Sequence, residues 1–285
     1  MDTYELMANV RNHTRLHTEN ELPTPILLAQ LNLASGFIGQ MLYPLYKEDL
    51  VKRVSYAAQS SNLSVPKDVL LLVNVYRKNT SGSYKLANKI TIERSASIGT
   101  PQIPSDANYP VYVQLGNYLE FTPALSATDV RIEYRKRIAD LVWGTGTSAP
   151  DSTYITLDNY APVRDDILND YWLALYKNVS GDIRKVADVL ITDYNATTRR
   201  ATTTTPEAAQ EYIYALVPIL PDEFHNFLVD YTLMLLARSG YYKVDYRPLE
   251  QSIIQLLMLT LKMNGVEYAS QVEGKGGEGY VKQGK

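Results

Sequence analysis

The chain has 285 residues, a formal net charge of −3, no cysteine, and 23 tyrosines against four phenylalanines. An apolar share of 45% with 21% charged residues is typical of a folded chain that forms one large domain or two smaller ones. The missing cysteines exclude a disulfide framework, thiolate catalysis and sulfur-ligated zinc or iron. The near-neutral charge argues against a protein that binds nucleic acid by pairing many lysines and arginines with phosphates.

Targeting and membrane segments are not expected in this chain. Its first residues carry acids and no apolar block, unlike a signal or transit peptide. The longest apolar stretch, Ile253 to Met263, includes Gln255, Thr260 and Lys262 and is shorter than the roughly 20 apolar residues that span a bilayer. We therefore expect no membrane contact.

Two helices are predicted at the start of the chain. Apolar residues recur at helical spacing from Tyr4 to Val10. A second helix begins at Thr24, a capping residue followed by Pro25 at the first helical position, and it ends before Pro44. Its expected apolar face consists of Leu27, Leu31, Ala34 and Ile38.

From Val51 to Tyr134 the apolar pattern has a period of two, which predicts a meander of short antiparallel strands. The predicted strands are Lys52–Tyr56, Val69–Tyr76, Lys85–Ile92, Val111–Leu115, Tyr118–Phe121 and Val130–Ile138. Gly116 and Asn117 can supply the positive backbone angles of a tight turn, so we expect a hairpin there.

A small β module is predicted next. The glycine-rich stretch Trp143–Pro150 has the composition of a linker, and the threonine run before Pro206 closes the module. The strand-like segments between them are Tyr154–Leu157, Tyr171–Tyr176 and Val189–Tyr194.

Two further helices are predicted near the end of the chain. Asp222 and Glu223 lie in the first turn of one, where they oppose the positive end of the helix dipole, and Gly240 ends it. The last helix begins near Pro248 and ends near Gly265.

These elements predict an α+β fold. Its expected core is a helical bundle of two N-terminal and two C-terminal helices, joined by the strand meander and an inserted small β module. The expected divisions are 1–142 for the N-terminal helices and sheet, 143–206 for the inserted β module, 207–265 for the C-terminal helices, and 266–285 for a flexible, glycine-rich C-terminal tail.

No residue pattern predicts catalysis, a metal or a cofactor. His13 and His17 would share a helix face, but they lack a third ligand and the glutamate of a helical zinc protease motif. His225 is expected at a core rim or an interface. The carboxylate pairs Asp165-Asp166 and Asp222-Glu223 suit a turn and a helix start better than the two walls of a glycosidase cleft. We therefore expect a protein that is not an enzyme.

The sharpest candidate site is a strip of arginines. Strand alternation places Arg131, Arg135 and Arg137 on one face, together with Glu133. Two interpretations stay open: a solvated sheet face with cross-strand salt bridges, or a contact with an acidic neighbouring subunit or with phosphates. The strip is too small for strong DNA affinity.

The tyrosine surplus suits strands and protein interfaces alike. Tyr241, Tyr242 and Tyr246, between the last two helices, form a candidate interface patch. The full set of candidate interface residues is Arg131, Arg135, Arg137, Tyr241, Tyr242, Tyr246, Tyr268, Val272 and Tyr280.

The order of these elements resembles the head-tail adaptor, or connector (head completion), proteins of tailed bacteriophages. The segments that carry the resemblance are the helix Leu22–Gly36, the strand start Val65–Leu70, the hairpin end Tyr118–Pro123, the strand Val130–Lys136 and the acidic-led helix Ile219–Tyr231. They lie within residues 1–142 and 210–265. The segment 151–205 departs from the family pattern and is similar to small β modules inserted in phage virion proteins.

The resemblance implies a structural virion protein at the head-tail interface, present in the host cytoplasm during assembly. It implies a homo-oligomeric ring of twelve copies below the portal protein, which extends the DNA ejection channel, passes genomic DNA without sequence recognition and docks tail or nozzle proteins. The C-terminal tail would order on binding the portal. A tail-completion or baseplate component, or a host- or carbohydrate-binding virion module, stays open as an alternative.

Overall fold

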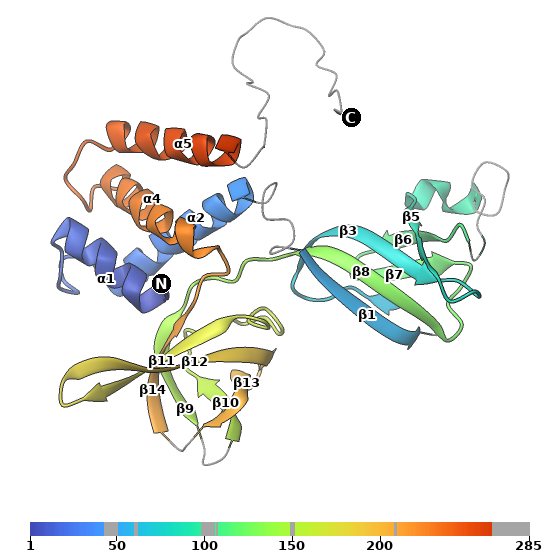
Figure 1. Ribbon diagram of the computed structural model, residues 1–285, viewed down its shortest axis with the longest axis horizontal. Helices are drawn as coiled ribbons and strands as arrows, with labels where there is room; N and C mark the ends of the chain where they lie inside the picture. Colours follow the sequence, from blue (N-terminus) through green and yellow to red (C-terminus); the bar gives the residue numbers. More distant parts are fainter. Residues whose placement is uncertain are drawn as a thin grey trace, which may run out of the picture.

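The computed structural model describes residues 1–42, 51–59, 62–97, 106, 108–148, 152–207 and 210–263. Figure 1 shows three parts: a group of helices made by both ends of the chain, a pair of small sheets, and a closed barrel. The chain passes from the first helices to the sheets, then through the barrel, and returns to the helices. Both β parts are therefore insertions between the two helical halves.

The expected helical-bundle core with a small β module is wrong. Strands make up 39% of the chain and helices 28%, and six of the strands close into a barrel. The error has a physical origin, since the period-two pattern locates a strand but carries no information on whether the edges of a sheet meet.

The helical part contains the four predicted helices, which are confirmed. They are α1 (Thr3–Thr14), α2 (Thr24–Leu42), α4 (His225–Arg238, preceded by the 3-10 turn η2, Asp222–Phe224) and α5 (Tyr246–Met263). Asp2 caps α1 by accepting hydrogen bonds from the backbone N–H groups of Tyr4 and Glu5. Leu27, Leu31 and Ile38 of α2 are fully buried in the core that α2 shares with α1 and α4, as their spacing predicts.

By length and composition, α2 is the one described helix that could cross a membrane. Its apolar stripe instead packs into the core of the helical part, with Leu27, Leu31 and Ile38 at zero exposure. A core helix meets the same length and composition criteria as a spanning one.

The next part of the chain forms two sheets that pack face to face, here called the sandwich. One sheet has the order β1 (Val51–Gln59), β8 (Thr128–Lys136), β3 (Val69–Lys78), β4 (Tyr84–Leu86), and the other has the order β2 (Leu63–Ser64), β7 (Tyr118–Thr122), β6 (Val111–Leu115), β5 (Asn88–Lys89). A 3-10 turn, η1 (Ile92–Ser97), follows β5. Side chains such as Leu119, Ile132 and Tyr134 from both sheets fill the space between them.

The predicted hairpin at Gly116-Asn117 is confirmed. Leu115 of β6 lies opposite Tyr118 of β7, and Gly116 has a φ of +60°, which favours glycine.

The barrel contains six strands in the closed order β10-β13-β12-β11-β14-β9. Their bounds are β9 (Trp143–Ser148), β10 (Ser152–Leu157), β11 (Trp172–Val179), β12 (Asp182–Asn195), β13 (Arg200–Glu207) and β14 (Gln210–Leu216). The barrel is antiparallel throughout, and its interior is filled by buried side chains such as Leu173, Ile191 and Tyr214.

Three of the six barrel strands come from segments that we interpreted differently. The expected linker Trp143–Pro150 contains β9, the closing threonine run lies in β13, and β14 lies in the range 207–265 that we assigned to helices. Glycine and threonine repeats weaken the apolar alternation in β9 and β13, so these segments lack the usual signature of a strand.

Candidate functional site

The histidines do not form a site. Helix α1 ends at Thr14 with Arg15 in the left-handed conformation, so exposed His17 does not share a helix face with His13. His225 is buried, and its Nε2 lies 3.0 Å from the carbonyl oxygen of Leu220. Burial lowers the pKa of His225. Among the residues that the structure describes, no group of three or more His, Cys, Asp or Glu side chains could hold a metal ion.

The three arginines of the predicted strip lie in three different environments. Arg131 stacks over the ring of Tyr84 at 4.0 Å, and Arg135 lies within 3.4 Å of the carbonyl oxygen of Gly39 in α2. Arg137 follows the end of β8, and its side chain is exposed. The strip is therefore divided between the sheet face, the helical part and the edge of a cleft.

The carboxylate of Glu133, on this sheet face, accepts several hydrogen bonds. Its carboxylate accepts from Arg53 Nε at 2.7 Å, Asn74 Nδ2 at 2.8 Å and Tyr76 Oη at 3.1 Å. Burial acts to raise the pKa of Glu133, but the hydrogen bonds from these three groups outweigh it and the pKa is lowered. Hydrogen bonds to one carboxylate therefore link β1, β3 and β8 on this face.

A second polar cluster joins the sandwich to the barrel. Buried Asp68 accepts a hydrogen bond from Tyr134 Oη at 2.8 Å and lies 3.7 Å from Lys52 Nζ, which pairs at 2.7 Å with Asp170 before the barrel strand β11. Lys136 is also buried, donates to the carbonyl oxygen of Asn169, and lies over the Tyr171 ring.

The environment of Lys136 disfavours its charge. Burial lowers the pKa of Lys136 from 10.5 to about 8, and Lys52 adds to the shift while Asp170 and Asp68 oppose it. Tyr134 stays neutral in the physiological range, because burial and its hydrogen bond to Asp68 raise its pKa. The cluster joins the sandwich to the barrel through hydrogen bonds and ion pairs that include a buried lysine.

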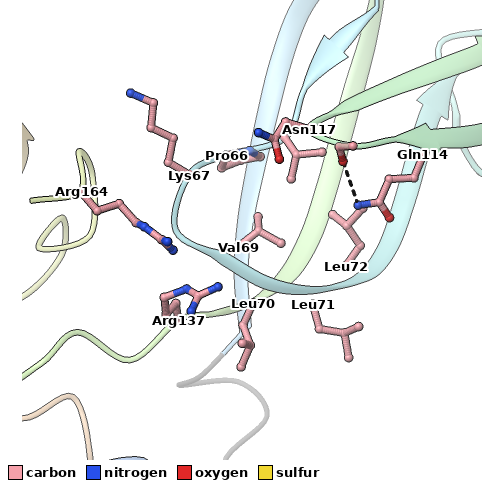
Figure 2. A pocket seen from close by; sticks show the side chains of 12 residues that line it. Pro66, Lys67, Val69, Leu70, Leu71, Leu72, Gln114, Asn117, Arg137 and Arg164 are labelled. Atoms are coloured by element: carbon pink, nitrogen blue, oxygen red, sulfur yellow. Dashed lines mark hydrogen bonds between the residues drawn. The ribbon is translucent and has the colours of Figure 1, made fainter. Parts of the chain in front are cut away.

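Beside this junction lies a cleft of about 420 Å³, shown in Figure 2. Its lining combines the start of β3, the turn of the β6–β7 hairpin and two arginines, Arg137 and Arg164. Figure 2 shows the side chains of both arginines extending toward the start of β3. Lys67 also lines the cleft, but its Nζ pairs with Asp165 Oδ2 at 2.5 Å.

A third feature is the outer surface of α5. Ile253 and Leu257 pack against α4 and are buried, whereas Ile254, Met258 and Leu259 are 42%, 41% and 55% exposed. The apolar arc of α5 is thus wider than the part that α4 covers, which is unusual for a helix at a solvated surface.

The tyrosine patch is only partly exposed. Tyr241 is exposed, whereas Tyr242 packs against the core of the helical part and Tyr246 packs against α4 and α5 residues. The remaining candidate interface residues, Tyr268, Val272 and Tyr280, lie outside the described residues, as does the expected flexible tail 266–285.

Sequence reasoning missed Arg164 and the outer surface of α5. We interpreted Asp165-Asp166 as a turn pair, and Asp166 does occupy a turn with a φ of +63°, but the neighbouring Arg164 carried no signal of its own. The amphipathic spacing of α5 was visible, but which of its apolar residues stay uncovered depends on where α4 lies. No protein-family model matches the chain, and no curated protein is significantly similar to it.

Proposed function

We propose that this protein is a structural component of a tailed-bacteriophage virion, a head-tail adaptor that assembles into a homo-oligomeric ring below the portal protein. In this role it extends the DNA channel, docks tail or nozzle proteins and carries out no catalysis. Genomic DNA passes through the ring without being recognised by its sequence.

The architecture is consistent with an assembly role. The segments that carry the family resemblance fall in the helical part and the sandwich, and the barrel is inserted between β8 and η2. Figure 1 shows the sandwich and the barrel extending from the helical part in different directions. A subunit with this shape offers a separate surface to a neighbouring copy, to the portal and to the tail, as a cyclic ring requires.

The observation that carries the proposal is the uncovered apolar surface of α5. Ile254, Met258 and Leu259 flank the buried stripe of this helix, so a single neighbouring helix cannot cover them all. In a ring, the adjacent subunit covers this surface and removes its apolar side chains from water.

The test measures assembly in the presence of a portal. We expect the purified chain mixed with portal rings to form rings visible by electron microscopy, and the double variant Ile254→Ser/Leu259→Ser to stay monomeric in sedimentation. The control is Val179→Ser, which changes an equally exposed apolar residue at the β11–β12 hairpin of the barrel.

Two outcomes would contradict the proposal. One is a persistent monomer that binds glycans through the barrel, since that behaviour belongs to a host- or carbohydrate-binding module. The other is a ring that forms equally well from the double variant, since α5 would then not be the subunit contact. Rings that bind tail tubes or baseplates but not portals would point instead to a tail-completion or baseplate component.

A further inference from the structure

We propose that the cleft between the sandwich and the barrel binds an extended, acidic segment of a partner protein. The segment adds as a strand to the open edge of β3 and places a carboxylate between Arg137 and Arg164. This inference concerns a second surface, and it does not depend on ring formation through α5.

The charge of the cleft points to an anion. Arg137 and Arg164 both line it, and within the described part of the chain neither guanidinium has a hydrogen bond or an ion pair. The nearby cation Lys67 is already neutralised by Asp165 at 2.5 Å. Two unpaired guanidiniums that face one space attract a carboxylate, which can accept two parallel hydrogen bonds from an arginine.

The backbone beside the arginines points to an extended chain. On one side β3 pairs with β8 along its length, but on the other side β4 pairs with it only at Tyr76–Lys78. From Val69 to Asn74, no described strand lies along that second side of β3. An unpaired edge offers N–H and C=O groups to an incoming strand, which is a recurring way for sheets to bind peptides.

The side chains along this edge favour a protein segment over nucleic acid. Leu70, Leu71 and Val73 are 45%, 57% and 42% exposed. The register between β3 and β8 shifts twice in this stretch, once between Val69 and Leu71 and once between Leu72 and Asn74. Apolar side chains beside two arginines match a segment that alternates apolar and acidic residues, whereas a phosphate backbone would gain little from leucine and valine.

The binding experiment uses a short, end-blocked peptide of alternating threonine, valine and aspartate, labelled for fluorescence anisotropy. We expect it to bind the full chain, and we expect the double variant Arg137→Gln/Arg164→Gln to bind it about tenfold more weakly or worse. Leu71→Ser, which removes an exposed apolar contact at the edge, should weaken binding several-fold. All three changed side chains are exposed, so the variants should unfold at the same temperature as the unchanged protein.

The controls separate this site from general charge effects. Arg94→Gln/Arg184→Gln removes two positive charges from exposed arginines in η1 and in the β11–β12 hairpin, and it should leave binding unchanged. A peptide with lysine in place of aspartate should not bind. The proposal is overturned if the acidic peptide does not bind, if it binds the Arg137→Gln/Arg164→Gln variant equally well, or if single-stranded oligothymidylate of the same length binds this cleft more tightly than the peptide.

Discussion

The sandwich and the barrel are both built mainly from antiparallel strands, but they differ in how many strand edges are paired. Every barrel strand has a neighbour on both sides, because β9 pairs with β10 as well as with β14. In the sandwich, β3 keeps an open edge from Val69 to Asn74 in the described part of the chain. Closure removes the backbone groups that a partner strand would pair with. The barrel therefore satisfies its strand edges internally, whereas the described part of the sandwich keeps an edge on which another chain can pair.

The junction between the two β parts adds to this contrast. On the sandwich side, Tyr134 donates a hydrogen bond to Asp68. Lys52 pairs with Asp170, and Lys136 contacts Asn169 and Tyr171, three residues that precede β11. The cluster is largely buried and polar, so the two parts are held by specific hydrogen bonds and ion pairs as well as by apolar contact.

The largest expected effect comes from the barrel core. Leu173 is fully buried inside the barrel, so Leu173→Ala should lower the free energy of unfolding by about 3 kcal/mol through lost burial and a new cavity. Leu71→Ala, at the open edge of the sandwich, should change it by less than about 0.5 kcal/mol. Urea denaturation of both variants checks the difference. Equal losses would mean that the β3 edge is covered in the protein in solution.

The junction should respond to alkaline pH. The pKa of Lys136 is about 8 in the folded protein and 10.5 ordinarily, so the unfolded chain binds more protons between these values and stability rises with pH. The expected gain from this group between pH 8 and about 9.5 is about 1 to 2 kcal/mol. The window ends there because tyrosines ionise in the unfolded chain near pH 10, whereas burial raises the pKa of Tyr171 and Tyr214 in the folded state.

Lys136→Met isolates the contribution of this lysine. We expect the variant to unfold at higher denaturant concentration than the unchanged protein at pH 7, and to lose most of the rise in stability above pH 8. The measurement is a series of urea titrations over this range. Lys52→Met is the matched control and should keep the rise, because burial is the larger cause of the Lys136 shift. A rise of the same size in the Lys136→Met variant would assign the pH dependence to other groups.

Closure of the barrel at β9 should depend on a glycine. A Cβ atom at Gly144 would lie 2.2 Å from Asp158 Oδ2, whose carboxylate accepts hydrogen bonds from Thr145 N at 2.7 Å and Tyr214 Oη at 2.7 Å. Gly144→Ala should therefore displace Asp158 and lower the unfolding free energy by about 1 to 3 kcal/mol. Thermal unfolding followed by circular dichroism checks this.

The matched substitution is Gly36→Ala in α2, the smallest expected effect. A Cβ atom there meets nothing within 4 Å, and alanine is the better helix former, so this change should stabilise the protein by about 0.5 to 1 kcal/mol. If Gly144→Ala proves neutral, the close approach of Asp158 to β9 is not needed for closure.

The local pattern of the chain predicted most individual elements. Thr24 and Pro25 located the start of α2, and Gly116 located the β6–β7 hairpin. Asp222, predicted in the first turn of a helix, lies in the 3-10 turn η2 directly before α4. These succeed because capping, turn geometry and helical spacing act over a few residues and leave a direct signature in the sequence.

The candidate site was less predictable. Alternation along β8 placed Arg131, Glu133 and Arg135 on one face of the strand but not against the same neighbours. Arg164 reaches the same cleft as Arg137 only because the barrel folds back beside the sandwich. Contacts between residues that lie far apart in the sequence follow from the packing of whole domains. The local spacing of apolar residues carries no information on that packing.

By itself, the sequence determined where the helices and most strands form, that no cysteine thiol is present, and that the net charge is close to zero. The tertiary structure alone decided that Trp143–Ser148 and the threonine-rich β13 are barrel strands and that Glu133 binds Arg53. It also decided that, among the described residues, the Arg137 guanidinium has no hydrogen-bond or ion-pair partner and that Ile254, Met258 and Leu259 of α5 stay exposed. The physical reason is the range of the forces involved: backbone preferences act between neighbours in the chain, whereas sheet closure, ion pairing and burial depend on which surfaces meet when the whole chain has folded.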